Sequence, residues 1–332
     1  MKFSTFTVFD NYQELVPRTV EQFMDEVLEQ TVVAEELGFD AAWYAEHHFA
    51  EYGVNPSPHV TLAAAAKMTR NIRLGVAVSV LPLHDPVRVA EDYAVVDILS
   101  GGRLLLGLGS GYLPFEFAGF KIPMEDKALR FNDALDVILK AWSGPFSHQG
   151  PYYQYPEITL NVQPIQKPFP PLWVAALRKE GVKHIARMGY RIMGIAYVNS
   201  NSRSELADVI QTYKTAYREH GHGNADNLEI PVAFHVHVAE SREEAEANAK
   251  EALNLYLRTR KYGKDIQYED LVQREQAIFG SPDEVIQQIK AYREIGITHF
   301  MALMNFGALE HAKVLKSMEL FGKYVIPAFK EE

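Results

Sequence analysis

Short apolar runs alternate with amphipathic stretches along the whole chain of 332 residues. Each run is long enough for one buried strand, and each stretch carries apolar residues at helical spacing. We expect strands at residues 3–9, 41–49, 72–82, 103–112, 172–177, 190–196, 229–240 and 298–304. We expect helices at residues 19–39, 58–69, 85–102, 125–142, 179–188, 202–219, 241–260, 281–297 and 308–329.

This alternation amounts to eight strand–helix units. Strands that alternate with helices pair in parallel through right-handed crossovers, and eight units favour a closed barrel over an open sheet. The sequence therefore predicts an α/β fold, a single (β/α)8 TIM barrel over residues 1–332. One long insertion, residues 143–171, follows the fourth unit and is rich in proline and aromatic residues. We expect this insertion and the loop after His48 to cover an active site at the carboxyl ends of the strands.

The composition excludes several classes of functional site. The chain has no cysteine, which excludes disulfides, thiolate metal sites and a catalytic thiol. The net charge is −10 and the basic residues are scattered, so we expect no nucleic-acid or anionic-lipid surface. No segment approaches the roughly 18 apolar residues of a membrane span, and the N-terminus lacks a signal-peptide pattern. We expect a soluble, cytoplasmic protein.

Polar side chains end the second predicted strand in the stretch "AEHHF", residues 45–49, which contains Glu46. Successive residues of a strand point to opposite faces, so His47 and His48 cannot both bind one metal ion from a regular strand. One of them should face the barrel mouth, where an imidazole can move a proton near neutral pH. Acid–base chemistry and satisfied structural polarity are both open interpretations.

Two further patterns are weaker. His235 and His237 in "FHVHV" share a strand face at a spacing that metal sites use. They lie on the seventh strand, however, and no aspartate ends the eighth, so a lining or structural role is the better interpretation. The stretch "GLGSGY", residues 107–112, only resembles a dinucleotide-binding loop, because Pro114 follows and no helix begins directly behind it. Its glycines allow either a tight turn or close approach of a flat ring or a phosphate.

Five stretches in the same order resemble the bacterial luciferase-like, flavin-dependent monooxygenase family. They are "AEHHF", "VLPLHDPVRVAEDYAVVDILSGGRLLLGLGSGY", "YPEITLNVQPIQKPFPPLWVAAL", "IFGSPDEVIQQIKAYREIGITHFMALMNFG" and "KVLKSMELFGKYVIPAF". The resemblance implies that reduced FMN binds at the barrel mouth and reacts with oxygen. The resulting flavin hydroperoxide would then oxidise a small, apolar organic substrate.

The resemblance also implies roles for individual residues. His47 corresponds to the catalytic histidine of the family, with Glu46 and His48 as its neighbours in the motif. A non-proline cis peptide is expected in the third strand, at Ala77-Val78. The residues that we expect to contact the flavin are Ala77, Val78, Gly109, Ser110, Arg130, Arg178 and Lys179.

The chain departs from the family pattern at the phosphate. Gly109 stands where bacterial luciferase has a reactive cysteine, and Ser110 stands where an arginine contacts the phosphate. We expect Arg178, at a helix N-terminus that favours anions, to compensate together with Lys179 or Ser110. Arg130 is a further candidate, and a solvated charge at the rim is the alternative for Arg178.

The resemblance further implies a homodimer and a separate flavin reductase, because no nicotinamide-binding domain is visible. No metal is expected. Phe6, Trp43 and Phe306 are candidate walls of an apolar pocket. Three other functions stay open: a deazaflavin-dependent dehydrogenase on the same fold, a non-catalytic flavin-binding relative, and a metal-dependent hydrolase.

Overall fold

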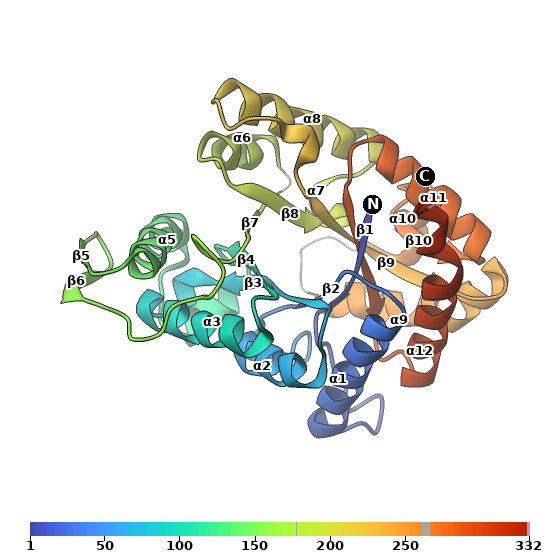
Figure 1. Ribbon diagram of the computed structural model, residues 1–332. Coiled ribbons are helices and arrows are strands. Elements are labelled where there is room, and N and C mark those ends of the chain that lie inside the picture. Colours follow the sequence, from blue (N-terminus) through green and yellow to red (C-terminus); the bar gives the residue numbers. More distant parts are fainter. Residues whose placement is uncertain (177, 261–265, 331–332) are drawn as a thin grey trace.

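The computed structural model describes residues 1–176, 178–260 and 266–330. Within these residues nine parallel strands form one sheet, which closes into the barrel of Figure 1. Around the closed barrel the order is β1 (Lys2–Thr7), β2 (Ala41–Tyr44), β3 (Arg73–Val80), β4 (Leu104–Gly109), β7 (Leu172–Ala175), β8 (Arg191–Ile195), β9 (Pro231–Val238) and β11 (His299–Asn305), which pairs with β1. The predicted (β/α)8 TIM barrel is confirmed.

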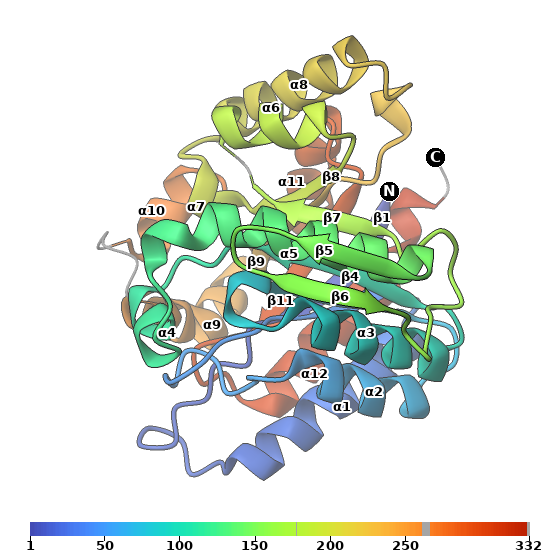
Figure 2. The same ribbon diagram turned by 90° about the vertical axis from the view of Figure 1, so that its left-hand side faces the viewer.

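Helices connect the strands and surround the barrel (Figure 1 and Figure 2). They are α1 (Val20–Glu36), α2 (Pro58–Met68), α3 (Pro86–Ser100), α4 (Pro114–Gly119), α5 (Lys127–Ser143), α6 (Lys179–Arg187), α7 (Ala196–Asn199), α8 (Arg203–Glu219), α9 (Arg242–Thr259), α10 (Tyr268–Gln273), α11 (Pro282–Glu294) and α12 (His311–Leu320). None of the helices in the described ranges has both the length and the apolar character that crossing a bilayer requires.

The helix boundaries follow local capping chemistry. The Asp85 carboxylate accepts the backbone N–H groups of Val87 and Arg88 at 3.0 and 3.1 Å and so begins α3. Gly101 ends the same helix in the left-handed conformation, with φ of +69°, which glycine adopts at little cost. The Asp85 cap lies five residues after the end of β3, so the start of this helix lies close to the barrel mouth.

The second strand is shorter than predicted. It stops at Tyr44, so Glu46, His47 and His48 lie in the loop behind it and outside regular β-structure. The expected alternation of two histidines across a strand therefore does not apply, and their directions are set by hydrogen bonds.

The sequence interpretation missed one strand of the sheet. The strand β10 (Ala277–Gly280) pairs with the carboxyl half of β9, from His235 to Val238. It is only four residues long and directly precedes α11, so its pattern merges with that of the helix. Residue 177, the last residue of the predicted fifth strand, lies outside the described residues.

The insertion at 143–171 forms a hairpin on the outside of the barrel, made of β5 (Phe146–Gln149) and β6 (Gln154–Ile158) (Figure 1). The Asp133 carboxylate on α5 holds it by accepting from His148 Nε2 at 2.7 Å. Asp133 also accepts the backbone N–H groups of Tyr152 and Tyr153 at 2.8 and 3.0 Å. The hairpin contributes no residue to the main pocket, so the expectation that it covers the site is wrong.

Two tryptophans fill the barrel below its mouth. The Trp43 and Trp173 rings are fully buried and meet edge to face, with centroids 5.6 Å apart. Gly75 makes room for this packing, because a Cβ there would lie 2.2 Å from the Trp43 ring. Trp43 and Phe306 therefore belong to the core and do not line the pocket, whereas Phe6 does line it.

A charged network closes the amino-terminal end of the barrel. The Glu229 carboxylate accepts from Lys2 Nζ at 2.6 Å, Arg73 Nη2 at 3.1 Å and His299 Nδ1 at 2.7 Å. Burial alone would raise the pKa of Glu229, but the hydrogen bond and charge of His299, with Lys2 and Arg73, hold it well below its usual range. One carboxylate thus links β1, β3 and β11.

The Glu229 network predicts a pH-dependent loss of stability. The Glu229→Gln variant should lose about 1–3 kcal/mol at neutral pH, because Lys2, Arg73 and His299 lose an ionised acceptor. A depressed pKa stabilises the fold above the unfolded value of 4.5 and loses that effect as the pH falls below it, so the difference should shrink in acid. Urea unfolding at a series of pH values measures this, with exposed Glu157→Gln as control. A difference that is constant with pH would contradict the assignment.

Candidate active site

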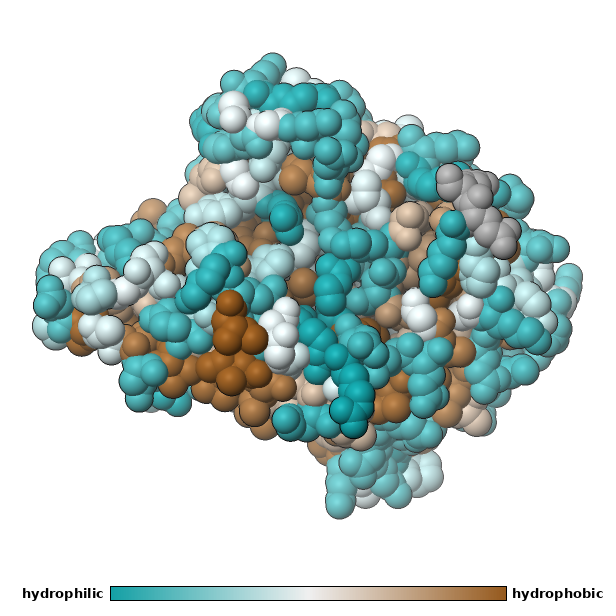
Figure 3. Space-filling view, in the orientation of Figure 1, coloured by the Kyte–Doolittle hydropathy of each residue, from teal (hydrophilic) through white to brown (hydrophobic). Residues whose placement is uncertain are grey.

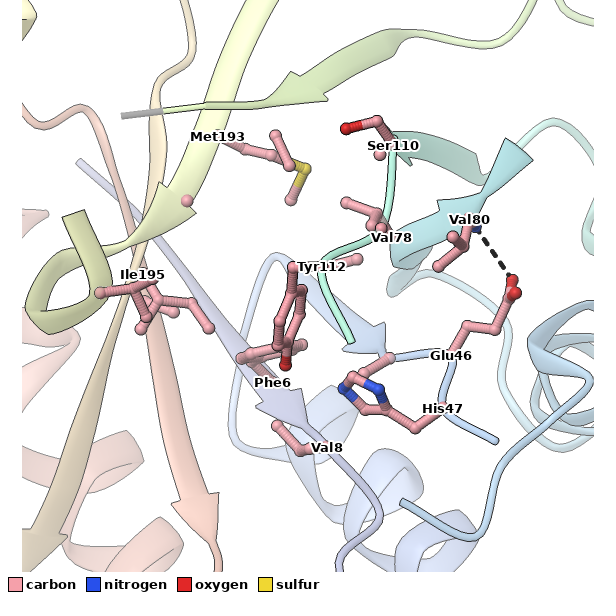
Figure 4. A pocket seen from close by; sticks show the side chains of 18 of the residues that line it. Phe6, Val8, Glu46, His47, Val78, Val80, Ser110, Tyr112, Met193 and Ile195 are labelled. Carbon is pink, nitrogen blue, oxygen red and sulfur yellow. Dashed lines mark hydrogen bonds between the residues drawn. The ribbon is translucent and has the colours of Figure 1, made fainter. Parts of the chain in front are cut away.

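A pocket opens at the carboxyl ends of the barrel strands (Figure 4). It encloses about 1040 Å³ when the solvent-filled space at its open mouth is included. Its apolar lining includes Phe6, Val8, Ala77, Val78, Met193 and Ile195. Its polar lining includes Glu46, His47, Ser110, Tyr112, Glu116 and Arg260. The expected position of the site is therefore occupied by a largely apolar cavity.

His47 reaches the pocket from the loop behind β2 and is held by a carboxylate from α4. Its Nδ1 lies 3.1 Å from Glu116 Oε1, which also accepts the backbone N–H of His48 at 2.9 Å. Glu116 is 1 % exposed, so little water competes for these bonds. Because Glu116 Oε1 accepts the His48 N–H, we assign it as the acceptor of the His47 Nδ1–H as well, which leaves Nε2 to accept or donate a proton.

Aromatic and glycine contacts fix the plane of the His47 ring. The Tyr52 ring lies over it with centroids 4.5 Å apart, and Tyr112 meets it edge to face at 6.0 Å. Gly53 packs against its base, where an added Cβ would lie 2.4 Å from His47 Cβ. Figure 4 shows the imidazole beside Tyr112 at the pocket wall. The ring is thus oriented before any ligand arrives.

Glu46 is buried beside His47 and accepts four hydrogen bonds. Its Oε1 accepts from His84 Nε2 at 2.7 Å and His48 Nε2 at 3.1 Å. Its Oε2 accepts from Ser79 Oγ at 3.3 Å and the Val80 N–H at 3.2 Å. Burial opposes ionisation, but the hydrogen bonds from both histidines lower the pKa of Glu46 to about 2.

The effect on His84 is the reverse. Burial alone would lower the pKa of His84, but the hydrogen bond and charge of Glu46 raise it above its usual value. An ionised Glu46 beside a protonated His84 is therefore the favoured pairing. This pair ties the loop behind β2 to the start of α3.

The same side chains have the spacing of a metal site. Among the described residues, ligand atoms of Glu46, His48 and His84 lie within 4.8 Å of one another. Both oxygens of Glu46 are already satisfied by hydrogen-bond donors, and His47 is not part of the group. Hydrogen bonding alone therefore accounts for this arrangement, and we interpret it as the support of His47.

His235 and His237 are buried in the body of the protein and do not line the pocket. Burial lowers the pKa of His235 to about 3 and that of His237 to about 4, so both rings are neutral. Aromatic rings of Tyr256 and Phe306 pack against His235 with centroids 4.8 and 5.1 Å away. Of the expected lining or structural role, the lining role is wrong and the burial of both rings fits the structural one.

The third and fourth strands bring the expected flavin contacts together. Ala77-Val78 is a cis peptide, as expected, and both residues line the pocket with Gly109 and Ser110. Gly109 is needed for packing, because a Cβ there would lie 2.4 Å from Val78 Cγ2. Gly111 has φ of +75° and makes the turn that follows. In the pocket wall, Gly109 therefore allows β4 to pack closely against Val78 of β3, and Gly111 allows the turn after β4.

The cations near the pocket differ in part from those predicted. Arg178 is exposed at the N-cap of α6, directly behind the pocket residue Ala176. Lys127, which the sequence interpretation missed, donates to the Gly111 carbonyl at 3.1 Å. Burial, followed by the charge of Arg178, lowers the pKa of Lys127. Two cations therefore lie near each other at the edge of the pocket.

The other two predicted cations lie away from the pocket. The Arg130 guanidinium lies over the Tyr152 ring at 4.7 Å, beside the outer hairpin. Lys179 is exposed and forms an ion pair with Asp208 on α8. Neither residue lines the cavity.

Comparison with known proteins agrees with this geometry. The family model "Luciferase-like monooxygenase" matches residues 1–299. The oxygenase component of flavin-dependent trigonelline monooxygenase from Acinetobacter baylyi is 27 % identical, with 100 % of this chain and 96 % of the relative covered. The 4-hydroxyprotoasukamycin monooxygenase from Streptomyces nodosus is 30 % identical, with 89 % and 84 % covered.

A solved structure gives the same result. Monooxygenase RslO1 from Streptomyces bottropensis superposes with a TM-score of 0.92 at 26 % identity, over 99 % of this chain and 100 % of that one. A match over most of the chain, a barrel with its pocket at the carboxyl ends of the strands, and a carboxylate-held histidine in that pocket lead to one assignment. The chain belongs to the luciferase-like monooxygenase family.

Proposed function

We propose that the protein is an FMN-dependent monooxygenase that transfers one oxygen atom of O2 to a small organic molecule. Reduced FMN supplies two electrons and two protons when bound, so the second oxygen atom leaves as water and FMN is oxidised. The observation that carries the proposal is His47, held by buried Glu116 at the wall of a largely apolar pocket. The flavin dependence named for the trigonelline enzyme supports the choice of cofactor.

The pocket residues fit a flavin. Apolar side chains from two strands, Val78 and Met193, suit a flat ring system. Ser110, Lys127 and Arg178 would hold the phosphate, because a phosphate relieves the repulsion between two neighbouring cations. Arg178 also stands at the N-terminus of α6, where backbone N–H groups favour an anion.

The chain's own residues contribute orientation and proton transfer. His47 exchanges a proton at Nε2, while Glu116 holds Nδ1 and stabilises the charged ring. The rings of Tyr52 and Tyr112 cover the imidazole and would limit the access of water to the reacting centre.

The proposal includes a separate flavin reductase and a cytoplasmic location. The name of the trigonelline enzyme, an "oxygenase component", supports a division of labour in which a second protein reduces FMN. A nicotinamide-dependent reductase draws on reducing equivalents of the cytoplasm.

The proposal also includes a homodimer. Exposed apolar side chains lie at helical spacing on α3, where Val95, Ile98 and Leu99 are 42, 44 and 38 % exposed. Val60 on the neighbouring α2 is 59 % exposed. An apolar area over the region of these helices is visible in Figure 3. Such a surface suits a second copy of the chain better than water.

The function is tested by mixing the anaerobic protein with reduced FMN and then oxygen, and following flavin absorbance. We expect a flavin hydroperoxide that outlives the same species in buffer, and oxygenated products by mass spectrometry from a panel of ketones, alkenes and phenols. Reoxidation at the protein-free rate would overturn the proposal. Binding of a reduced deazaflavin in preference to FMN would instead identify the hydride-transfer branch.

His47 should be required for turnover but not for flavin binding. The His47→Ala variant should lose about 10²–10⁴-fold in product formation, because it removes the proton-transfer group. Glu116→Gln should lose less and shift the pH profile, because it keeps an acceptor but removes the charge. Dissociation constants for FMN and the exposed His184→Ala variant serve as controls. Unchanged turnover in His47→Ala would exclude the assigned role.

Lys127 should recognise the phosphate of the flavin. The Lys127→Ala variant should bind FMN about tenfold more weakly, because a charge-assisted bond to the phosphate is lost. Riboflavin, which lacks the phosphate, should bind both proteins equally in the same fluorescence titration. Lys183→Ala, an exposed lysine on α6, is the matched control. Equal weakening of both ligands would place the phosphate elsewhere.

The apolar face of α3 should mediate dimerisation. The Ile98→Lys variant should sediment as a monomer at concentrations where the unaltered protein is a dimer, because a buried ammonium is costly at an apolar interface. Met188→Lys, at a residue 43 % exposed beside α6, should remain dimeric. A dimer that survives Ile98→Lys would remove this face from the interface.

A further inference from the structure

Arg260 is a buried cation in the wall of the active-site pocket. It is 4 % exposed, caps the carboxyl end of α9 and lines the same cavity as His47. No local sequence motif marks it. A guanidinium offers five N–H donors in a planar fork that matches a carboxylate.

The surroundings of Arg260 are aromatic. Its guanidinium carbon lies 4.6 Å from the centroid of Tyr197 and 6.0 Å from that of Tyr112. The Tyr112 hydroxyl donates to Tyr52 Oη at 3.3 Å, and Tyr52 and Tyr256 share a hydrogen bond of 3.2 Å. In such a region of low polarity a charge attracts an anion strongly, because little water screens it.

A buried tyrosine whose hydroxyl has no hydrogen-bond partner lies beside this cation, and a buried histidine packs against that tyrosine. Among the described residues, neither the Tyr197 hydroxyl nor either ring nitrogen of His235 has a hydrogen-bond partner. Tyr197 is 6 % exposed, His235 is fully buried, and their rings lie 5.2 Å apart. Folded proteins rarely leave such groups unsatisfied, so a polar ligand or ordered water is expected here.

This position is separate from the proposed phosphate site. Lys127 and Arg178 lie at the N-terminal ends of α5 and α6, and α6 follows β7. Arg260 follows α9 and β9, and β8 lies between β7 and β9 in the barrel. The proposed phosphate site and Arg260 therefore lie in different parts of the pocket wall.

We propose that the substrate of the monooxygenase is an organic carboxylate whose charged group binds Arg260, with Tyr197 beside it. Its apolar body would lie against Phe6 and Val8, within reach of His47. This inference rests on the proposed function and narrows its substrate class from apolar molecules to organic acids.

Binding of matched acid and amide pairs tests the inference. Benzoate, cyclohexanecarboxylate and hexanoate are each compared with the corresponding primary amide by calorimetry, on protein with and without FMN. At least one acid should bind about tenfold or more tightly than its amide, the difference that a charge-assisted pair provides. In Arg260→Met this preference should disappear, whereas amide affinity and FMN affinity should stay within about twofold. Arg258→Met, at an exposed arginine of α9, should change nothing.

Three results would overturn the inference. They are the absence of any acid preference, a preference that persists in Arg260→Met, and weaker FMN binding in Arg260→Met with the acid preference unchanged. The last result would assign the guanidinium to the flavin. Failure of FMN binding in the unaltered protein would instead refute the proposed function, because acid preference is measured without FMN as well.

Discussion

The active-site end of this barrel depends on the burial of one carboxylate, Glu46. A buried charge is tolerated only when its lone pairs are satisfied, and here four donors from three segments of the chain converge on it. The loop behind β2 is thereby fixed against β3 and α3. His47 is the next residue in the chain, so its backbone is fixed by the same bonds before Glu116 sets the direction of the ring. The position of His47 therefore depends on the hydrogen bonds that its neighbour Glu46 accepts.

Much of the architecture was predictable from the sequence, because each strand is a separate apolar run followed by an amphipathic helix. The position of the site followed from the barrel, and the Ala77-Val78 peptide from the resemblance to a family. Glu116 and Arg260 could not be predicted in the same way. Glu116 is 69 residues from His47 in the sequence, and each of the two reaches the pocket from a helix or its end, without a local motif. Their convergence is a property of the closed sheet.

The pocket is electrically asymmetric although the protein as a whole carries a net charge of −10. Lys127 and Arg178 make one edge positive, Arg260 makes another wall positive, and His47 lies on an apolar surface between hydrogen-bonded carboxylates. Positive charge concentrated in a cleft raises the local concentration of anions against the overall field of the protein. Trp43 and Trp173 fill the barrel core, and neither of them lines the cleft. The apolar lining and the positive charge of the cleft together restrict which molecules can reach His47.

The outer hairpin has a consequence for how this chain can diverge. It is anchored to α5 through Asp133 and also reaches the start of α3, where the Tyr153 hydroxyl donates to the His84 carbonyl at 3.3 Å and the Tyr155 hydroxyl to the Asp85 carboxylate at 2.8 Å. None of its residues lines the cavity, but its tyrosines touch the segment that carries His84, a partner of Glu46. A lineage could lengthen the tip of the hairpin into a recognition arm for another protein only while the anchoring contacts of Tyr152, Tyr153 and Tyr155 are kept. The insertion can therefore vary at its tip and is constrained where it contacts α5 and the start of α3.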